Sequence, residues 1–223
     1  LPSREDVKKR NAAAGKTEDK GCFLWLDDGV GAIMNKLKEL GLEENTLVIF
    51  SPDHGYYRFG KSTLHDYGMR VPMLMKWPGT LEAGRKYNGM ASNIDVVPTL
   101  LDVAGIEPPA DYALDGVSLK PAMFGDDAPV REVLFSEMGH ARAVKSKDWK
   151  YIAVRYPEKI QRRIDRGGKF ANFDGMEPMD RPYHTRNGHL GYNASIQNPH
   201  YFEADQLYDL KNDPYEMNNI YGQ

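Results

Sequence analysis

The sequence predicts an α/β fold followed by a smaller antiparallel α+β subdomain. Two patterns carry this prediction: an amphipathic helix that leads into a short apolar strand at residues 47–50, and a run of alternating polar and apolar residues at 150–154. With 223 residues the chain can bury a sizeable core in one or two domains. We divide it into an α/β part, residues 1–125, and an antiparallel subdomain, residues 126–223.

The first part begins with a helix over residues 23–40, for which the spacing of apolar residues predicts one buried face. These apolar positions are Phe23, Leu26, Val30, Ile33, Met34, Leu37 and Leu40. Gly41 ends the helix, and the apolar run at 47–50 predicts a parallel strand buried on both faces. Residues 71–77 predict a second strand, and a capping box at Ser92 begins a helix that ends at Gly105.

The second part of the chain has a different residue pattern, with short strand-like runs and a long irregular segment. Residues 133–135 and 141–144 predict short strands, and 150–154 alternate as an exposed antiparallel strand does. Residues 157–200 are irregular but rich in aromatic and histidine side chains, which argues against simple disorder and favours a functional segment.

Composition excludes several classes of protein. The 29 basic and 32 acidic residues leave no basic excess, so a nucleic-acid-binding surface is not indicated. No apolar run approaches the roughly 20 residues of a membrane-spanning helix. The single cysteine, Cys22, excludes an internal disulfide framework, and its place in the apolar pattern of a helix predicts core packing.

Asp53 and His54 directly follow the predicted strand at 47–50. Open α/β sheets place their ligands at the carboxyl ends of strands, and a carboxylate beside an imidazole can hold a divalent cation. Two ligands do not complete a site, so further ligands would come from elsewhere. For the dipeptide alone, a loop-capping Asp with a hydrogen-bonded His is the favoured alternative.

Lys61 lies in a glycine-containing turn seven residues after this pair. A lysine ammonium close to a metal neutralises charge on a tetrahedral oxyanion. Residues 55–62 also match the nucleotide-binding pattern G-x-x-x-x-G-K-[ST] literally. That loop must open a helix directly after a strand, and the residues after Ser62 do not read as a helix, so nucleotide binding is the less favoured alternative.

Five blocks of the sequence, in order, carry a resemblance to a known family. Residues 45–79 contain NTLVIFSPDHG and FGKSTLHDYGMRVPMLMKWPG, and the later blocks are SNIDVVPTLLDVAG (92–105), DGVSLKP (115–121), AVKSKDWKYI (143–152) and QLYDLKNDPYEMNN (206–219). Together they resemble the formylglycine-dependent sulfatases of the alkaline-phosphatase superfamily. The resemblance implies the last core strands and helices of the sulfatase sheet, followed by that family's small C-terminal antiparallel subdomain.

The resemblance also implies roles for individual residues. Asp53 and His54 match ligands of a divalent metal, usually Ca²⁺ with Mg²⁺ as the other choice, and Lys61 matches the lysine that contacts the sulfate ester. Arg70 is expected to be structural and to pair with a carboxylate such as Asp66.

The nucleophile region of the family has no counterpart in this sequence. Sulfatases make formylglycine from a Cys or Ser in a C/S-x-P-S-R motif, and Cys22 is not followed by Pro-Ser-Arg. We therefore expect the chain to be the C-terminal part of a sulfatase, inactive alone and completed by an N-terminal part. The family likeness favours an extracellular or periplasmic location.

The long decorated segment favours a sulfated carbohydrate over another sulfate ester as substrate, because His and Arg donors suit hydroxyl, carboxylate and sulfate groups. The candidate substrate-binding residues are His140, Arg142, Arg58, Tyr57, His65, His184 and Arg181. For each of them a surface hydrogen bond or packing contact is the alternative. For the whole protein, the alternatives are a phosphate or phosphonate ester hydrolase of the same superfamily and a noncatalytic sulfatase-like fragment.

Overall fold

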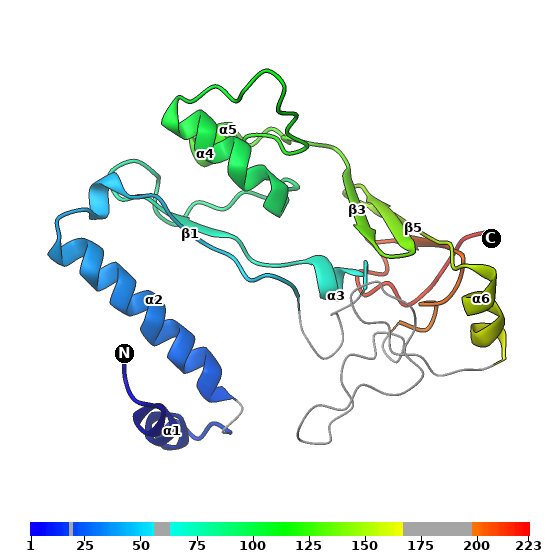
Figure 1. Ribbon diagram of the computed structural model, residues 1–223, viewed down its shortest axis with the longest axis horizontal. Coiled ribbons are helices and arrows are strands. Elements are labelled where there is room, and N and C mark those ends of the chain that lie inside the picture. The colour runs from blue at the N-terminus through cyan, green and yellow to red at the C-terminus, as the bar shows by residue number, and fades with distance from the viewer. Residues whose placement is uncertain (18–19, 56–62, 167–197) are drawn as a thin grey trace. The chain divides into compact units, whose positions relative to one another are not determined.

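The computed structural model describes residues 1–17, 20–55, 63–166 and 198–223 (Figure 1). Contacts divide the chain into one unit of Leu1–Ile49 and Leu74–Arg85, and a second of Phe50–Met73 and Lys86–Gln223. These units do not coincide with the predicted domains 1–125 and 126–223, which stay a prediction. The difference arises because Leu64, from the predicted first domain, packs in one hydrophobic core with Ile152 and Tyr208 from the predicted second domain.

The first unit contains two helices and a two-stranded sheet. Helix α1 (Arg4–Ala13) begins at Ser3, whose side chain accepts from the backbone of Asp6 in a capping box. Helix α2 (Gly21–Glu39) follows and ends just before Gly41, which has a φ of 65°. After the short 3₁₀ helix η2 (Glu43–Asn45), strand β1 (Val48–Phe50) pairs with β2 (Leu74–Lys76).

The predicted helix and strands of this unit are confirmed, but their predicted burial is wrong. Every residue of α2 stays at least partly exposed, including Phe23, Ile33 and Cys22. Helix α1 contacts α2, but it is mostly polar and Val7 is its one buried apolar side chain, so it cannot cover the apolar stripe. Strand β1 is likewise half-buried rather than buried on both faces.

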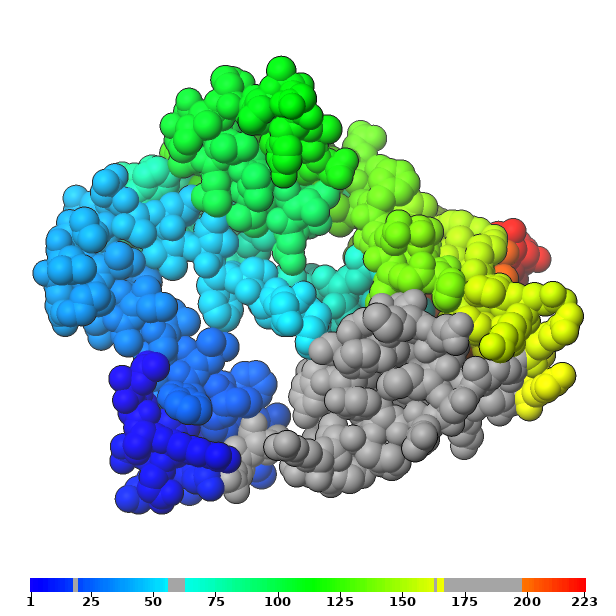
Figure 2. Space-filling model, in the orientation of Figure 1, coloured from blue at the N-terminus to red at the C-terminus, as the bar shows by residue number. Residues whose placement is uncertain are grey.

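The second unit contains the helix predicted after Ser92. A 3₁₀ turn, η3 (Asn93–Asp95), leads into α4 (Val96–Ala104), which ends at Gly105 in the left-handed conformation with a φ of 67°. Both the capping box and the glycine stop are confirmed. A four-residue helix, α5 (Lys120–Met123), contacts α4. The outer side chains of α4 form part of the surface seen in Figure 2.

Asp95 holds this helical region together. Its fully buried carboxylate accepts from the backbone N–H of Ser92 and of Val117, at 2.7 and 2.9 Å, and pairs with Arg131. A buried carboxylate is stable only when its oxygens have such partners.

A four-stranded antiparallel sheet in the order β3-β4-β5-β6 forms the centre of the second unit. Its strands are β3 (Leu134–Met138), β4 (Ala141–Lys145), β5 (Trp149–Val154) and β6 (Asp205–Asp209). The antiparallel subdomain is thus confirmed. Alternate residues of β5 are buried, and Ile152 and Val154 pack in the core with Tyr208 of β6.

Two further short helices belong to the second unit, one before the sheet in the sequence and one between β5 and β6. Helix α3 (Asp66–Met69) follows Leu64, and α6 (Glu158–Asp165) begins the segment that was predicted to be irregular from residue 157. Across the described ranges, no helix combines the length and the apolar character that crossing a membrane requires.

Candidate functional site

Asp53 and His54 lie in the bend that follows β1. The Asp53 side chain is 87% exposed, and its Oδ2 lies 3.8 Å from Nε2 of His54. Nδ1 of His54 is 2.7 Å from the carbonyl oxygen of Gly55. A carbonyl only accepts, so Nδ1 carries a proton, and Nε2 is the ring nitrogen that lies nearer the carboxylate.

Gly55 fastens this pair to α3. Its N–H donates to the carbonyl of Gly68 at 2.8 Å, and a Cβ added to it would lie 2.0 Å from the carbonyl oxygen of Tyr67. Only glycine allows the two backbones to approach this closely. The position of His54 is therefore set by a direct backbone contact with α3.

The donor chemistry of the pair fits a divalent cation. Two ligand atoms that each lie about 2.4 Å from the same ion are separated by a distance similar to the 3.8 Å between Asp53 Oδ2 and His54 Nε2. Within residues 1–17, 20–55, 63–166 and 198–223, no group of three or more His, Cys, Asp or Glu side chains could hold a metal. Asp53 and His54 would thus supply part of a coordination shell.

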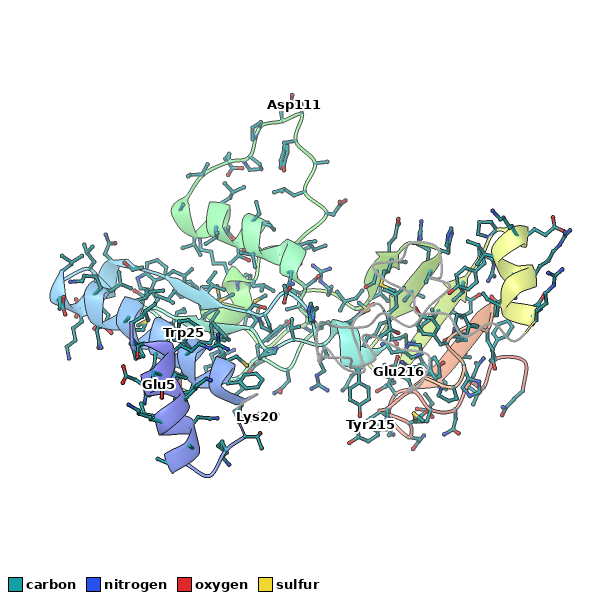
Figure 3. The ribbon with its side chains drawn as sticks, turned by 60° about the horizontal axis from the view of Figure 1, so that its bottom comes forward. Glu5, Lys20, Trp25, Asp111, Tyr215 and Glu216 are labelled. Atoms are coloured by element: carbon teal, nitrogen blue, oxygen red, sulfur yellow. The ribbon has the colours of Figure 1, made fainter. Side chains whose placement is uncertain are left out.

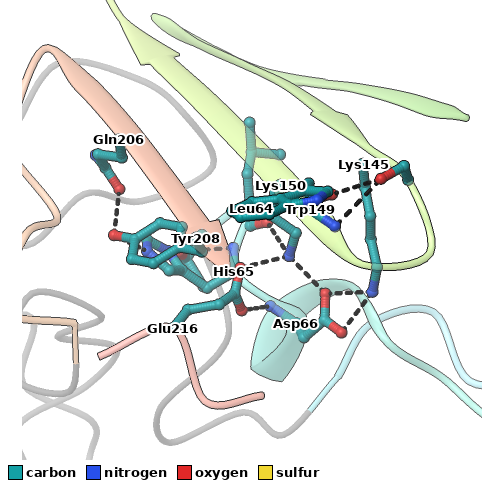
Figure 4. A network of polar contacts seen from close by, with 11 residues as sticks. Leu64, His65, Asp66, Lys145, Trp149, Lys150, Gln206, Tyr208 and Glu216 are labelled. Carbon is teal, nitrogen blue, oxygen red and sulfur yellow. Dashed lines mark hydrogen bonds and ion pairs between the residues drawn. The ribbon is translucent and has the colours of Figure 1, made fainter. Parts of the chain in front are cut away.

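Next to α3 lies a network of buried charges (Figure 4). Nζ of Lys150, whose side chain is 1% exposed, lies 2.5 Å from Oδ1 of Asp66 and 2.6 Å from Oε1 of the fully buried Glu216. Lys145 binds the same Asp66 carboxylate at 2.6 Å. We expected Arg70 to pair with Asp66, but these two lysines of the sheet hold it instead.

The charges in this network shift one another's titration. Burial acts to raise the pKa of Asp66, but Lys150 and Lys145 outweigh it and leave that pKa below its usual range. Burial also raises the pKa of Glu216, and here the attraction of Lys150 offsets only part of the effect.

His65 lies inside the protein rather than at an open surface, with 2% of the residue exposed. Its Nδ1 is 2.5 Å from the hydroxyl of Thr63, and its Nε2 is 3.3 Å from the hydroxyl of Tyr208, which donates to Gln206 at 2.8 Å. Both ring nitrogens have protein partners, so the geometry accounts for His65 as a packing residue. Its substrate-binding role stays a prediction.

His65 is expected to make stability depend on pH. Burial, then the charge of Lys150, lower its pKa from 6.5 to about 3, so the unfolded chain takes up a proton below 6.5 that the folded chain refuses. Stability should therefore fall as pH drops from about 6.5 towards 3, by up to about 1.4 kcal/mol per pH unit from this residue.

Urea denaturation between pH 4 and 7 measures this contribution as the difference in slope between the wild type and His65→Gln. Subtracting the two slopes removes the contribution of the carboxylates that both proteins share. Asp66 is one of them, and its lowered pKa also makes stability fall on acidification. Equal slopes for the two proteins would show that the histidine is not held neutral.

The remaining candidate residues fall into two groups, those on β4 and the turn before it and those outside the described residues. His140, in the turn before β4, packs edge-on against Tyr156 with ring centroids 5.6 Å apart. Arg142 on β4 is exposed and pairs with Glu137 at 2.9 Å. Lys61, Arg58, Tyr57, His184 and Arg181 lie outside the described residues. The roles of all these residues stay predictions.

Three residues of the charge network, Lys145, Lys150 and Glu216, were not found from the sequence. Lys150 carries a signal that could have revealed it, because in the alternation of β5 it occupies the same face as the buried Ile152 and Val154. A charged residue on the buried face of a strand requires a buried partner. Glu216 gives no such signal, since it lies in an irregular C-terminal segment beside α3 (Figure 3).

The residues after Ser62 also bear on the nucleotide-binding alternative. Thr63, Leu64 and His65 are not helical, and the helix that follows, α3, is only four residues long. A nucleotide P-loop opens a helix directly after its Lys-Ser or Lys-Thr pair. The segment that follows the literal match therefore does not form the helix that such a loop requires.

Comparisons with known proteins agree with one another. Residues 17–106 match the family model described as Sulfatase. An ulvan-active sulfatase from Formosa agariphila is 31% identical over 199 residues, covering 83% of this chain and 35% of that protein. An N-acetylglucosamine-6-O-sulfatase from Bacteroides thetaiotaomicron is 26% identical over 208 residues, covering 89% of this chain and 30% of that protein.

A solved structure supports the fold. A protein whose structure was solved in complex with its substrate, D-glucosamine-2-N,6-O-disulfate, superposes with a TM-score of 0.64 at 24% identity, over 91% of this chain and 35% of that one. The chain thus spans about a third of the length of the relatives that it matches. The α/β elements and the antiparallel subdomain agree with the fold of that structure, and residues 17–106 agree with the family model. The chain belongs to the sulfatase family.

Proposed function

We propose that this chain forms part of a sulfuric ester hydrolase that acts on sulfated carbohydrates. The observation that carries the proposal is the Asp53–His54 pair, in which Oδ2 of the carboxylate lies 3.8 Å from Nε2 of the imidazole while Nδ1 is bound to the Gly55 carbonyl. The relatives named above, which include an ulvan-active and an N-acetylglucosamine-6-O-sulfatase, support the substrate class.

In this proposal Asp53 and His54 hold a Ca²⁺ ion, with Mg²⁺ as the other candidate. Such an ion would draw charge from the sulfate oxygens. The Gly55 carbonyl keeps the proton on Nδ1 of His54, so that Nε2 stays available as a ligand. Lys61 binds the same sulfate group through its ammonium, which adds a second positive charge beside the ester.

We further propose that a formylglycine nucleophile is supplied by an N-terminal part of the enzyme. The matched relatives are about three times as long as the stretch that aligns, and the C/S-x-P-S-R motif does not occur around Cys22. Ser3, although it belongs to a Pro-Ser-Arg sequence, caps α1. Residues 1–223 alone are therefore expected to bring no nucleophile to the sulfate.

Activity assays test the proposed function. The chain alone should release no sulfate from N-acetylglucosamine 6-sulfate, whereas an enzyme that joins it to the remaining portion should release sulfate and far less phosphate from a matched phosphate ester. Preferential release of phosphate would favour a phosphate or phosphonate ester hydrolase. A joined protein without either activity would favour a noncatalytic sulfatase-like protein, and turnover by the chain alone would contradict the division of the site.

Metal removal tests the assigned ligands. Chelation of Ca²⁺ should abolish sulfate release by the joined enzyme, and Asp53→Asn should raise the Ca²⁺ concentration for half-maximal activity by about 10- to 100-fold, because an amide replaces a charged ligand. Asp126→Asn is a matched control, since Asp126 caps a local turn by accepting from the N–H of Ala128. An unchanged Ca²⁺ requirement in Asp53→Asn would exclude Asp53 as a ligand.

A further inference from the structure

We propose that Lys150, together with Asp66 and Glu216, is a positioning group that fixes the Asp53–His54 pair through α3. The inference rests on the proposed function, because the pair is assigned there as the metal ligands. All of the residues that carry it belong to the second unit.

The first step is the geometry around Lys150. Its ammonium contacts three oxygens from two parts of the chain: Oδ1 of Asp66 at 2.5 Å and the carbonyl of Leu64 at 3.2 Å, and Oε1 of Glu216 at 2.6 Å. A buried ammonium with three oxygen neighbours has little freedom to move, since a displacement would leave buried polar groups, the Glu216 carboxylate above all, without their partner. Lys150 thus ties β5 to the start of α3 and to the C-terminal segment.

The second step is the dependence of α3 on these contacts. Helix α3 has four residues, and a helix this short has no stability of its own in water. Its first residue, Asp66, is held at two points. The carboxylate binds Lys145 and Lys150, and the backbone N–H donates to Oε2 of Glu216 at 2.5 Å. The position of α3 is therefore determined by the charge network.

The third step leads from α3 to His54. Gly68, in the same turn as Asp66, accepts the N–H of Gly55 at 2.8 Å, and the carbonyl of Gly55 binds Nδ1 of His54 at 2.7 Å. The carbonyl of Tyr67 leaves no room for a Cβ at residue 55. A shift of α3 would therefore move Gly55 and release the imidazole from the tautomer that presents Nε2.

The conformation of Glu216 supports a specific role. Glu216 has a φ of 58°, the one positive value for a non-glycine residue in the part of the chain that the structure describes, and it is fully buried. This conformation costs about 1 kcal/mol or more for a residue with a side chain and persists only where its surroundings enforce it. Here those surroundings are Lys150 and the backbone N–H of Asp66.

The test uses the full chain without metal and follows two signals at the Asp53–His54 pair. The first is hydrogen exchange of the Gly55 amide, which reports its bond to Gly68. The second is the ¹⁵N shift of the His54 ring, which reports the tautomer. The variant Lys150→Met/Glu216→Met removes both charges together, so that no buried charge is left unpaired by the change, and Asp66 keeps Lys145.

In this double variant we expect Gly55 exchange to accelerate about tenfold or more, and the His54 shifts to move towards a mixture of tautomers. The milder Glu216→Gln keeps an acceptor for the N–H of Asp66 and should accelerate exchange about threefold, which provides a second test if the double variant does not fold. Lys120→Met, which breaks a half-exposed pair with Asp102, should leave both signals unchanged.

Exchange within twofold of the wild type and unshifted His54 signals, in a folded variant, would overturn the positioning role. Neither signal requires metal or turnover, so this result is independent of the proposed function. The proposed function would fail separately if the joined enzyme released no sulfate, and the metal assignment would fail if it released sulfate with neither Ca²⁺ nor Mg²⁺ present.

Discussion

Lys150→Met alone is expected to lower the free energy of unfolding by about 3–5 kcal/mol. Methionine matches the length of the lysine stem but leaves the fully buried carboxylate of Glu216 without its cation. Asp66 loses one of its two lysine partners at the same time. Removing one member of a buried ionic group costs far more than removing an exposed pair, because the remaining charge keeps its full desolvation penalty.

Urea denaturation at pH 7 followed by circular dichroism measures this loss. The double variant Lys150→Met/Glu216→Met should recover most of it, since the unpaired carboxylate is then gone. Lys120→Met should cost less than about 1 kcal/mol, because its pair with Asp102 is half-exposed. If Lys150→Met were as stable as Lys120→Met, Glu216 would have to be protonated in the folded protein, and the ion pair would not contribute.

The elements that local patterns determine were predictable from the sequence. The helix after Ser92 has a capping box at one end and a left-handed glycine at the other, and both signals lie within a few residues of the ends that they mark. The strand at 150–154, observed as β5 (Trp149–Val154), was predicted because alternation is a local consequence of the pleat. Asp53 and His54 could be chosen as candidate ligands for the same reason, since they directly follow a strand.

Features that depend on distant partners were not predictable in this way. The carboxylate of Asp66 was assigned to Arg70, four residues away, whereas its partners Lys145 and Lys150 lie about eighty residues further along the chain. Nothing local distinguishes these choices, because each would satisfy the charge of Asp66. The apolar stripe of α2 has a similar cause. Its spacing predicts a helix face suited to packing against other residues, but it does not identify which residues pack there.

Lys61→Ala is expected to reduce kcat/KM for a sulfated sugar by about 10²–10³ in a joined enzyme that contains this chain. Charge moves onto the oxygens around sulfur in the transition state, so an ammonium beside them stabilises the transition state more than the ground-state ester. Removing the ammonium should therefore raise the barrier by about 3–4 kcal/mol.

Steady-state kinetics on Lys61→Ala, Lys61→Arg and Lys76→Ala measure this effect. Lys76→Ala is the control, since Lys76 forms an exposed pair with Glu43. Lys61→Arg should retain part of the rate, because it keeps the charge but not the compact geometry of the ammonium. A Lys61→Ala enzyme within threefold of the wild type would remove Lys61 from the site and leave the metal held by Asp53 and His54 as the one cationic group proposed here for the sulfate.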